Sequence, residues 1–306
     1  MPERIAVRCS DPVVRGTLEQ WLIEGRLQPP RPLTLDVRVE PLLPGDQPDP
    51  RPIFRQPDLT IRSGGADGRV TIVWDRCPAE ADLLPGSRVA AVRLSPEAVR
   101  CLDDCLRQFM ITTLIFLLRR VGWHHVHGGI AVDPLGRGWL LAGNSGMGKS
   151  TTVALLAARG WSVGTDDIAF LAGGSDPVAA YSFHSPIALR PGGEALLRRG
   201  SGRPLPDRGK VGYWPEDLGS RWCPRIEPQI LIFPSVGEGR TEVSAVRPAQ
   251  AVAELVRWSA WVTLEPTLAQ DHLDLLTRLA AQARAYRIRL GPDLFQDPDL
   301  AARLIP

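Results

Sequence analysis

Hydrophobic and polar residues follow patterns that differ between the two halves of the chain. In the first half, residues 33–41 alternate apolar and polar side chains, as expected for a strand buried on one side. Apolar runs at 59–62 and 70–75 flank a glycine-rich turn and predict a hairpin. Further elements are predicted at 4–8 (strand), 12–24 (helix) and 44–58 (a loop rich in proline and aspartate). We therefore expect residues 1–95 to form an α+β accessory domain.

A long apolar helix is predicted next. Ser95 is a favourable N-cap and Pro96 suits a first turn, so the helix is expected to begin there and to run to about Arg120. Its longest apolar run, residues 109–118, is shorter than the roughly 20 residues that span a bilayer. We therefore expect residues 96–122 to be a buried linking helix, and we expect no membrane association.

The second half combines short apolar runs, glycine turns and helical patterns, which is typical of an α/β domain. Strands are expected at 127–132, 139–142, 161–165, 230–233, 243–246 and 286–290, with residues 168–171 extended and one or two further strands within 178–189. Helices are expected at 151–159, 248–262 and 266–284. Residues 192–224 are rich in glycine, proline and arginine and are expected to be irregular. The second domain is expected to cover residues 123–306.

The stretch from Gly143 to Ser150, which we call the glycine loop, carries the clearest candidate chemistry. It fits G-x-x-x-x-G-K-[ST] and lies between a strand pattern and a helix pattern, which is the context of a phosphate-binding P-loop. Glycines let backbone N–H groups face phosphates, and the helix N-terminus adds partial positive charge. Lys149 is expected to neutralise phosphates and Ser150 to bind Mg²⁺. The predicted nucleotide-binding residues are Gly143, Asn144, Ser145, Gly146, Met147, Gly148, Lys149, Ser150 and Thr151.

Lysine is rare in this chain. Of 36 lysines and arginines, only Lys149 and Lys210 are lysines, and a retained lysine indicates a need for a compact point charge. Lys210 lies in a glycine-flanked segment, residues 207–212, that we predict to close over the nucleotide as a lid. Arg190 is a further candidate to offset charge on the transferred group. The alternatives are a lysine retained by chance on a solvated loop and an ordinary surface arginine.

Two adjacent acids and a group of histidines complete the candidate site. Asp166 and Asp167 follow the predicted strand 161–165, where an acid would lie beside the Mg²⁺ and the phosphates. We assign Asp166 to the metal with Ser150, and Asp167 to proton abstraction from an attacking hydroxyl. A solvated turn is the alternative. Three of the five histidines lie at His124, His125 and His127, and we expect one of them to lie near the phosphates.

These residues together resemble a known kinase family. The segments 127–130, 143–150, 159–160 and 166–167 are similar to the core of HPr serine kinase/phosphorylase and its relatives, including kinases encoded in some peptide-biosynthesis clusters. The resemblance covers about 45 residues, from His127 to Leu171. It implies a P-loop fold related to phosphoenolpyruvate carboxykinase. It also implies roles for His127 (catalytic histidine), Lys149 (phosphate-binding lysine), Ser150 (Mg²⁺ ligand) and Asp167 (base for the acceptor serine).

The sequence departs from that family in two places. The Glu-Ile-Arg-Gly-Leu-Gly type of signature that follows the core in the bifunctional enzymes is absent, and residues 185–191 and 208–211 stand in its place. HPr as the substrate, and the phosphorylase reaction, are therefore not expected to carry over. The N-terminal half does not resemble the family's regulatory domain.

We expect the protein to transfer the γ-phosphoryl group of ATP, with Mg²⁺, to a serine hydroxyl of a protein or peptide. A non-catalytic nucleotide-binding regulatory module and a small-molecule phosphotransferase remain alternatives. The chain lacks the Asn-Lys-x-Asp motif that recognises guanine, so ATP is favoured over GTP. The net charge of +2 gives no argument for nucleic acid or membrane, and a homo-oligomer is left open. Five scattered cysteines and the lack of a signal-peptide pattern predict reduced thiols and a cytoplasmic location.

Overall fold

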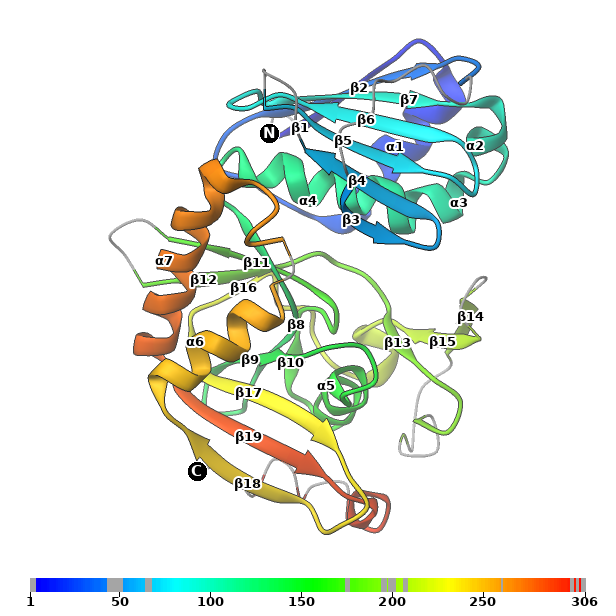
Figure 1. Cartoon of the computed structure of the whole chain (residues 1–306). Coiled ribbons are helices and arrows are strands. Elements are labelled where there is room, and N and C mark those ends of the chain that lie inside the picture. The colour runs from blue at the N-terminus through cyan, green and yellow to red at the C-terminus, as the bar shows by residue number, and fades with distance from the viewer. Residues whose placement is uncertain are drawn as a thin grey trace. The chain divides into compact units, whose positions relative to one another are not determined.

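A computed structural model describes residues 4–42, 52–63, 68–173, 177–193, 197, 202–205, 209–259, 261–297, 300 and 303. Within these residues the protein is a mixed α/β structure with three sheets. The chain divides into two compact units (Figure 1). The first comprises Met1–His124 and Thr263–Leu268, and the second His125–Val262 and Ala269–Pro306. The predicted linking segment thus lies within the first unit.

A seven-stranded sheet organises the first unit, in the order β1-β2-β7-β6-β5-β4-β3. The strands are β1 Ile5–Cys9, β2 Leu33–Val39, β3 Pro52–Gln56, β4 Leu59–Ser63, β5 Val70–Trp74, β6 Ala79–Leu83 and β7 Val89–Leu94. The first three in the order are parallel and the others antiparallel. The predicted strands 4–8 and 33–41 and the hairpin 59–75 are present. The predicted loop 44–58 is wrong where β3 lies, at the sheet edge where Pro52 is tolerated, and 43–51 lie outside the described residues.

Helices of the first unit depart from the prediction in one respect. Helix α1, Pro12–Gly25, is capped by Asp11, which accepts N–H bonds from Val13 and Val14 at 2.9 and 3.0 Å. The single helix predicted from Pro96 is wrong: it breaks at Cys101, whose φ and ψ are −113° and 41°. Its parts are α2 Pro96–Arg100, α3 Leu102–Cys105, the π-helix η1 Leu106–Met110, and α4 Ile111–Arg119.

The cysteines correct a third prediction. Cys77 and Cys101 are joined in a disulfide, whereas Cys9, Cys105 and Cys223 are free. Reduced thiols were therefore the wrong expectation for this pair. The two cysteines are 24 residues apart and meet only because the chain folds back, so their spacing gave no signal.

A second sheet forms the framework of the second unit, in the order β16-β12-β11-β8-β9-β17-β19-β18, with β10 paired to β8. The strands are β8 His124–Val132, β9 Gly138–Ala142, β10 Ser162–Val163, β11 Ile168–Ala172, β12 Ala179–Ser182, β16 Arg225–Ile226, β17 Pro228–Val236, β18 Glu242–Val246 and β19 Arg284–Leu290. Strands β9, β17 and β19 are parallel, so their carboxyl ends meet at one edge.

Helices cover both faces of this sheet (Figure 1). Because side chains alternate along a strand, Leu140 packs with helices α6 Pro248–Arg257 and α7 Pro266–Gln282, while Leu141 packs with α5 Lys149–Ala157. The apolar side chains on the two faces of the sheet thus form two buried clusters. Both clusters support the edge at which β9, β17 and β19 end.

Two of the three strands of a small third sheet lie in the segment predicted to be irregular, and the other lies in the predicted strand segment 178–189. The strands of this sheet, in the order β13-β15-β14, are β13 Ile187–Leu189, β15 Lys210–Tyr213 and β14 Arg203–Leu205. The expectation of an irregular segment is therefore wrong for β14, β15 and the 3₁₀ turn η3, Glu216–Leu218. Residues 194–196, 198–201 and 206–208 lie outside the described residues.

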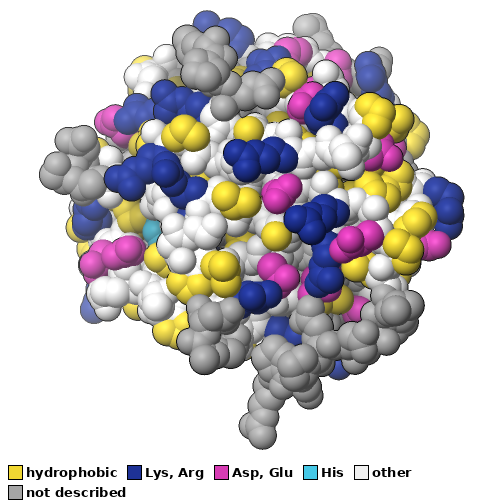
Figure 2. Space-filling view, turned by 90° about the horizontal axis from the view of Figure 1, so that it is seen from above, with side chains coloured by type: hydrophobic (Ala, Val, Ile, Leu, Met, Phe, Trp, Pro, Cys, Tyr) yellow, Lys and Arg dark blue, Asp and Glu magenta, His cyan; other side chains and the backbone are white. Residues whose placement is uncertain are grey.

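Charged side chains of both signs occur on the surface of the described residues (Figure 2). On the face drawn in Figure 2, basic side chains (blue) are interspersed with acidic ones (magenta). None of the described helices is both long enough and apolar enough to cross a bilayer.

Candidate active site

The glycine loop joins the end of β9 to the start of α5, in the strand–loop–helix arrangement that its sequence predicts. Gly146 and Gly148 have φ angles of +87° and +93°, a region that residues with a Cβ rarely adopt. A methyl group on Gly148 would in addition overlap Cδ1 of Leu290 on β19. Glycine is therefore required at Gly148 both by the backbone conformation and by the neighbouring strand.

Two backbone donors of the loop bond to side chains of the loop itself. The Asn144 N–H donates to Met147 Sδ at 3.0 Å, and the Ser145 N–H donates to Asn144 Oδ1 at 2.8 Å. A thioether is a weak acceptor and an amide oxygen is uncharged, so a phosphate oxygen would be the stronger partner for both N–H groups. The loop thus fits an anionic ligand without a change of fold.

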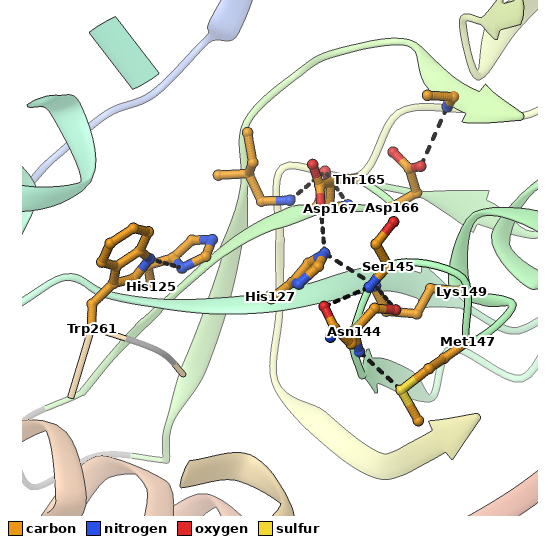
Figure 3. A network of polar contacts seen from close by, with 12 residues as sticks. His125, His127, Asn144, Ser145, Met147, Lys149, Thr165, Asp166, Asp167 and Trp261 are labelled. Carbon is orange, nitrogen blue, oxygen red and sulfur yellow. Dashed lines mark hydrogen bonds and ion pairs between the residues drawn. The ribbon is translucent and has the colours of Figure 1, made fainter. Parts of the chain in front are cut away.

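Three chemically distinct side chains converge beside the loop (Figure 3). His127 Nε2 lies 2.6 Å from Asp167 Oδ1 and 3.1 Å from Lys149 Nζ. Lys149 Nζ also donates to the Asn144 carbonyl oxygen at 3.1 Å. A protonated Nε2 donates to the Asp167 carboxylate, whereas an unprotonated Nε2 accepts from the Lys149 ammonium, so the tautomer decides which of the two hydrogen bonds is made. An acid, an imidazole and an ammonium group therefore form one contact network.

Backbone hydrogen bonds fix these side chains on different elements. The N–H of Gly128 donates to the Asp167 carbonyl at 3.1 Å, which ties the acidic turn to β8. The N–H of Gly143 donates to the His127 carbonyl at 3.2 Å, which ties the glycine loop to the same strand. The network is therefore held by the sheet.

The acidic pair lies in a turn and does not end a strand, which corrects the prediction for 161–165. Only Ser162–Val163 are extended, as β10. The Thr165 hydroxyl oxygen then accepts the N–H groups of Asp167 and Ile168, each at 3.2 Å, while the Thr165 carbonyl still accepts the Ile130 N–H of β8 at 2.8 Å.

Asp166 is the buried member of the pair, with 4% of its surface exposed. It accepts a hydrogen bond from the Ser150 hydroxyl and one from the Ala188 N–H at 3.3 Å. The two predicted metal ligands, Ser150 and Asp166, are thus side by side. Sequence reasoning missed Ala188, because a backbone N–H leaves no side-chain signal.

The two carboxyl groups differ in their electrostatics. Burial, together with the nearby charge of Asp167, raises the pKa of Asp166 to about 6. Burial also tends to raise the pKa of Asp167, but the hydrogen bond and charge of His127 and the charge of Lys149 lower it below its usual range. Asp167 is therefore ionised at neutral pH, and its side chain remains 49% exposed. It can accept a proton, although its low pKa makes it a weak base.

The loop lysine is itself a buried charge. Lys149 is 4% exposed, and burial lowers its pKa, against the opposing charges of Asp167 and Asp166. The single positive charge of Lys149 is already opposed by the two neighbouring carboxyl groups. An anionic ligand would therefore bind here together with a cation. The donor set of Ser150 and Asp166, hydroxyl and carboxylate oxygens, suits Mg²⁺.

The two secondary candidates also come near the loop. Arg190 Nη2 lies 3.3 Å from the Ser145 hydroxyl. The charge of Lys210 acts on Lys149 and lowers its pKa. Lys210 begins strand β15, so it does not lie on the solvated loop given as the alternative. Of the predicted lid, residues 207–208 lie outside the described residues.

The other two histidines have packing roles. His125 accepts a hydrogen bond from Trp261 Nε1 at 2.9 Å and meets Phe170 edge-on. His124 is 1% exposed and belongs to the first unit. Within the described part of the chain, no group of three or more His, Cys, Asp or Glu residues is arranged to hold a metal. A cation here would need phosphate oxygens as additional ligands.

Comparisons with known proteins add little to this geometry. No family model matches the chain, and no curated protein matches it. Among solved structures, the Hpr(Ser) kinase/phosphatase from Coxiella burnetii is similar at 12% identity and a TM-score of 0.31, over 60% of this chain and 88% of that one. A likeness of that size carries no argument about function, which therefore rests on the residues themselves.

Proposed function

We propose that this protein is an ATP-dependent kinase of the HPr-kinase-like type, which transfers the γ-phosphoryl group to a serine hydroxyl of a protein or peptide. The observation that supports this proposal is the network in which His127 Nε2 is 2.6 Å from Asp167 Oδ1 and 3.1 Å from Lys149 Nζ, beside the glycine loop. Such a network joins a proton acceptor to a phosphate-binding cation. A module that only binds nucleotide has no need of the acceptor.

Each group has a separate task in this proposal. Bound MgATP supplies the transferable phosphoryl group. Lys149 and the loop N–H groups hold phosphate oxygens, and Ser150 and Asp166 hold the metal. Asp167 accepts the hydroxyl proton, and His127 orients its carboxylate. Arg190 and Lys210 offset charge on the transferred group, so catalysis is largely positioning and charge neutralisation.

The proposal is tested by Asp167→Asn, with Asp271→Asn as the matched control on the exposed side of α7. Binding of MgATP is measured by calorimetry, and transfer is measured on a library of serine-containing peptides with labelled ATP. Asp167→Asn should keep ATP binding and lower transfer about 10²–10⁴-fold, while Asp271→Asn should behave as wild type. Full activity of Asp167→Asn would show that the base is misassigned. ATP binding without any transfer by the wild type would favour the regulatory module.

A further inference from the structure

The position of the candidate catalytic groups restricts where the rest of a nucleotide can lie. In the sheet order β11-β8-β9-β17-β19, His127 on β8 and the turn of Asp166 and Asp167 before β11 lie on one side of β9. If the γ-phosphoryl group is on that side, the phosphate chain runs along the glycine loop. The nucleobase then lies on the other side of β9, toward the carboxyl ends of β17 and β19.

An exposed apolar side chain lies at the carboxyl end of β17. Val236 is the last residue of β17 and is 65% exposed. A methyl group placed on Gly148 would be 3.4 Å from Val236 Cγ2, so the valine borders the glycine loop directly. Its partner in register on β19 is Leu290, which is 5% exposed and lies beneath the same glycine. Single exposed valines are common on protein surfaces, and the position beside the loop is what distinguishes this one.

The backbone around Val236 is held on both sides. The next N–H, of Gly237, donates to the Leu290 carbonyl at 3.0 Å. The loop that follows is closed by Thr241, whose hydroxyl donates to Asp293 at 2.6 Å and accepts the Gly291 N–H at 2.9 Å. Val236 is therefore a preorganised surface, which reduces the entropy lost when a ligand packs on it.

We propose that Val236 is the surface on which the nucleobase packs. This inference rests on the proposed function, because it needs the phosphates in the glycine loop. A valine side chain has no hydrogen-bonding group, so it contacts the face of a base and reads none of its edges. Val236 therefore strengthens the binding of nucleotides over that of phosphate chains, and it contributes equally to ATP and GTP.

The test compares two ligands that differ in the base and ribose, ATP and inorganic tripolyphosphate, each with Mg²⁺ in calorimetry. Val236→Ala should weaken ATP binding about three- to tenfold through lost apolar contact, and GTP binding should fall equally. Val236→Tyr should tighten ATP binding about tenfold, because aromatic side chains stack on bases. Tripolyphosphate affinity should stay unchanged in both variants.

Leu135→Ala is the matched control, because Leu135 is 79% exposed in the turn at the far end of β9 from the glycine loop. It should leave both affinities unchanged. An unchanged ratio of ATP to tripolyphosphate affinity in both Val236 variants would overturn the base site and leave the proposed function standing. If the wild type binds neither ligand, the proposed function fails and the base site fails with it.

Discussion

Gly129 on β8 offers a sharp test of how the site is held together. A methyl group at this position would lie 2.7 Å from Val153 Cγ2 on α5 and 3.1 Å from the Thr165 carbonyl oxygen. Carbon atoms in favourable contact are about 3.5–4.0 Å apart, so Gly129→Ala requires a shift on two sides. Val153 is fully buried in the apolar cluster beneath α5, and the Thr165 carbonyl belongs to the backbone just before the acidic pair.

The expected destabilisation follows from these contacts. Overpacking a filled core by one methyl group costs about 1–3 kcal/mol. Because neither neighbour is the free end of a flexible side chain, we expect about 2 kcal/mol for Gly129→Ala. The Asp166 Cα would be 3.4 Å from the new methyl group, so the acidic turn should move as well. A displacement of about 1 Å at a reacting group can lower transfer roughly 10²-fold.

Urea unfolding followed by circular dichroism and tryptophan fluorescence measures the effect. Gly193→Ala in the same unit is the matched control, because its methyl group would have no neighbour closer than Thr151 Oγ1 at 3.7 Å. It should change stability by less than about 0.5 kcal/mol. Adding Val153→Ala to Gly129→Ala should show favourable coupling between the two changes. Wild-type stability of Gly129→Ala, or the absence of coupling, would refute this account of the packing.

Three further predictions address other parts of the chain. Gly16→Ala should stabilise the protein by about 0.5–1 kcal/mol, because Gly16 lies inside α1 with nothing within 4 Å of the added methyl group; an unchanged urea midpoint would count against it. Burial, with the charge of Arg119, lowers the pKa of His124 to about 4. As the pH falls, His124 is therefore protonated in the unfolded chain at a higher pH than in the folded protein. Its contribution to the free energy of unfolding is complete above about pH 6.5 and falls toward pH 4 by up to about 1.4 kcal/mol per pH unit. His124→Gln should remove that slope, and parallel curves for wild type and variant would contradict it. Lys210→Arg should lower kcat much more than it weakens ATP binding, since the wide guanidinium does not replace a compact charge; wild-type turnover would indicate a lysine retained by chance.

Local patterns carried most of what could be predicted. The strand, glycine loop and helix around Lys149 follow from glycine positions and apolar runs within 20 or so neighbouring residues. The hairpin formed by β4 and β5 follows from the same kind of signal. The sequence also singled out His127, Lys149 and Asp167, and the structure brings them into contact, although their roles stay predictions.

Features that depend on distant parts of the chain could not be predicted. The Ala188 N–H reaches Asp166 across 22 residues, and a backbone donor has no sequence signature. The turn at Thr165 follows a strand shorter than predicted, and the two N–H groups that one hydroxyl accepts there could not be predicted from the sequence. The parallel placement of β7 beside β2 joins residues about 55 positions apart, and alternation along either strand says nothing about its partner.

Calorimetry with MgATP on the wild type and on Lys149→Ala tests the central claim most directly. The claim is that the glycine loop binds the phosphates of a nucleotide through a buried ammonium group. Thermal melting of both proteins should first establish that the variant is folded. We predict measurable binding by the wild type and a loss of at least about tenfold in Lys149→Ala, since a charge-assisted hydrogen bond contributes about 1.5–3 kcal/mol. Equal affinities, or no binding by the wild type, would contradict the account.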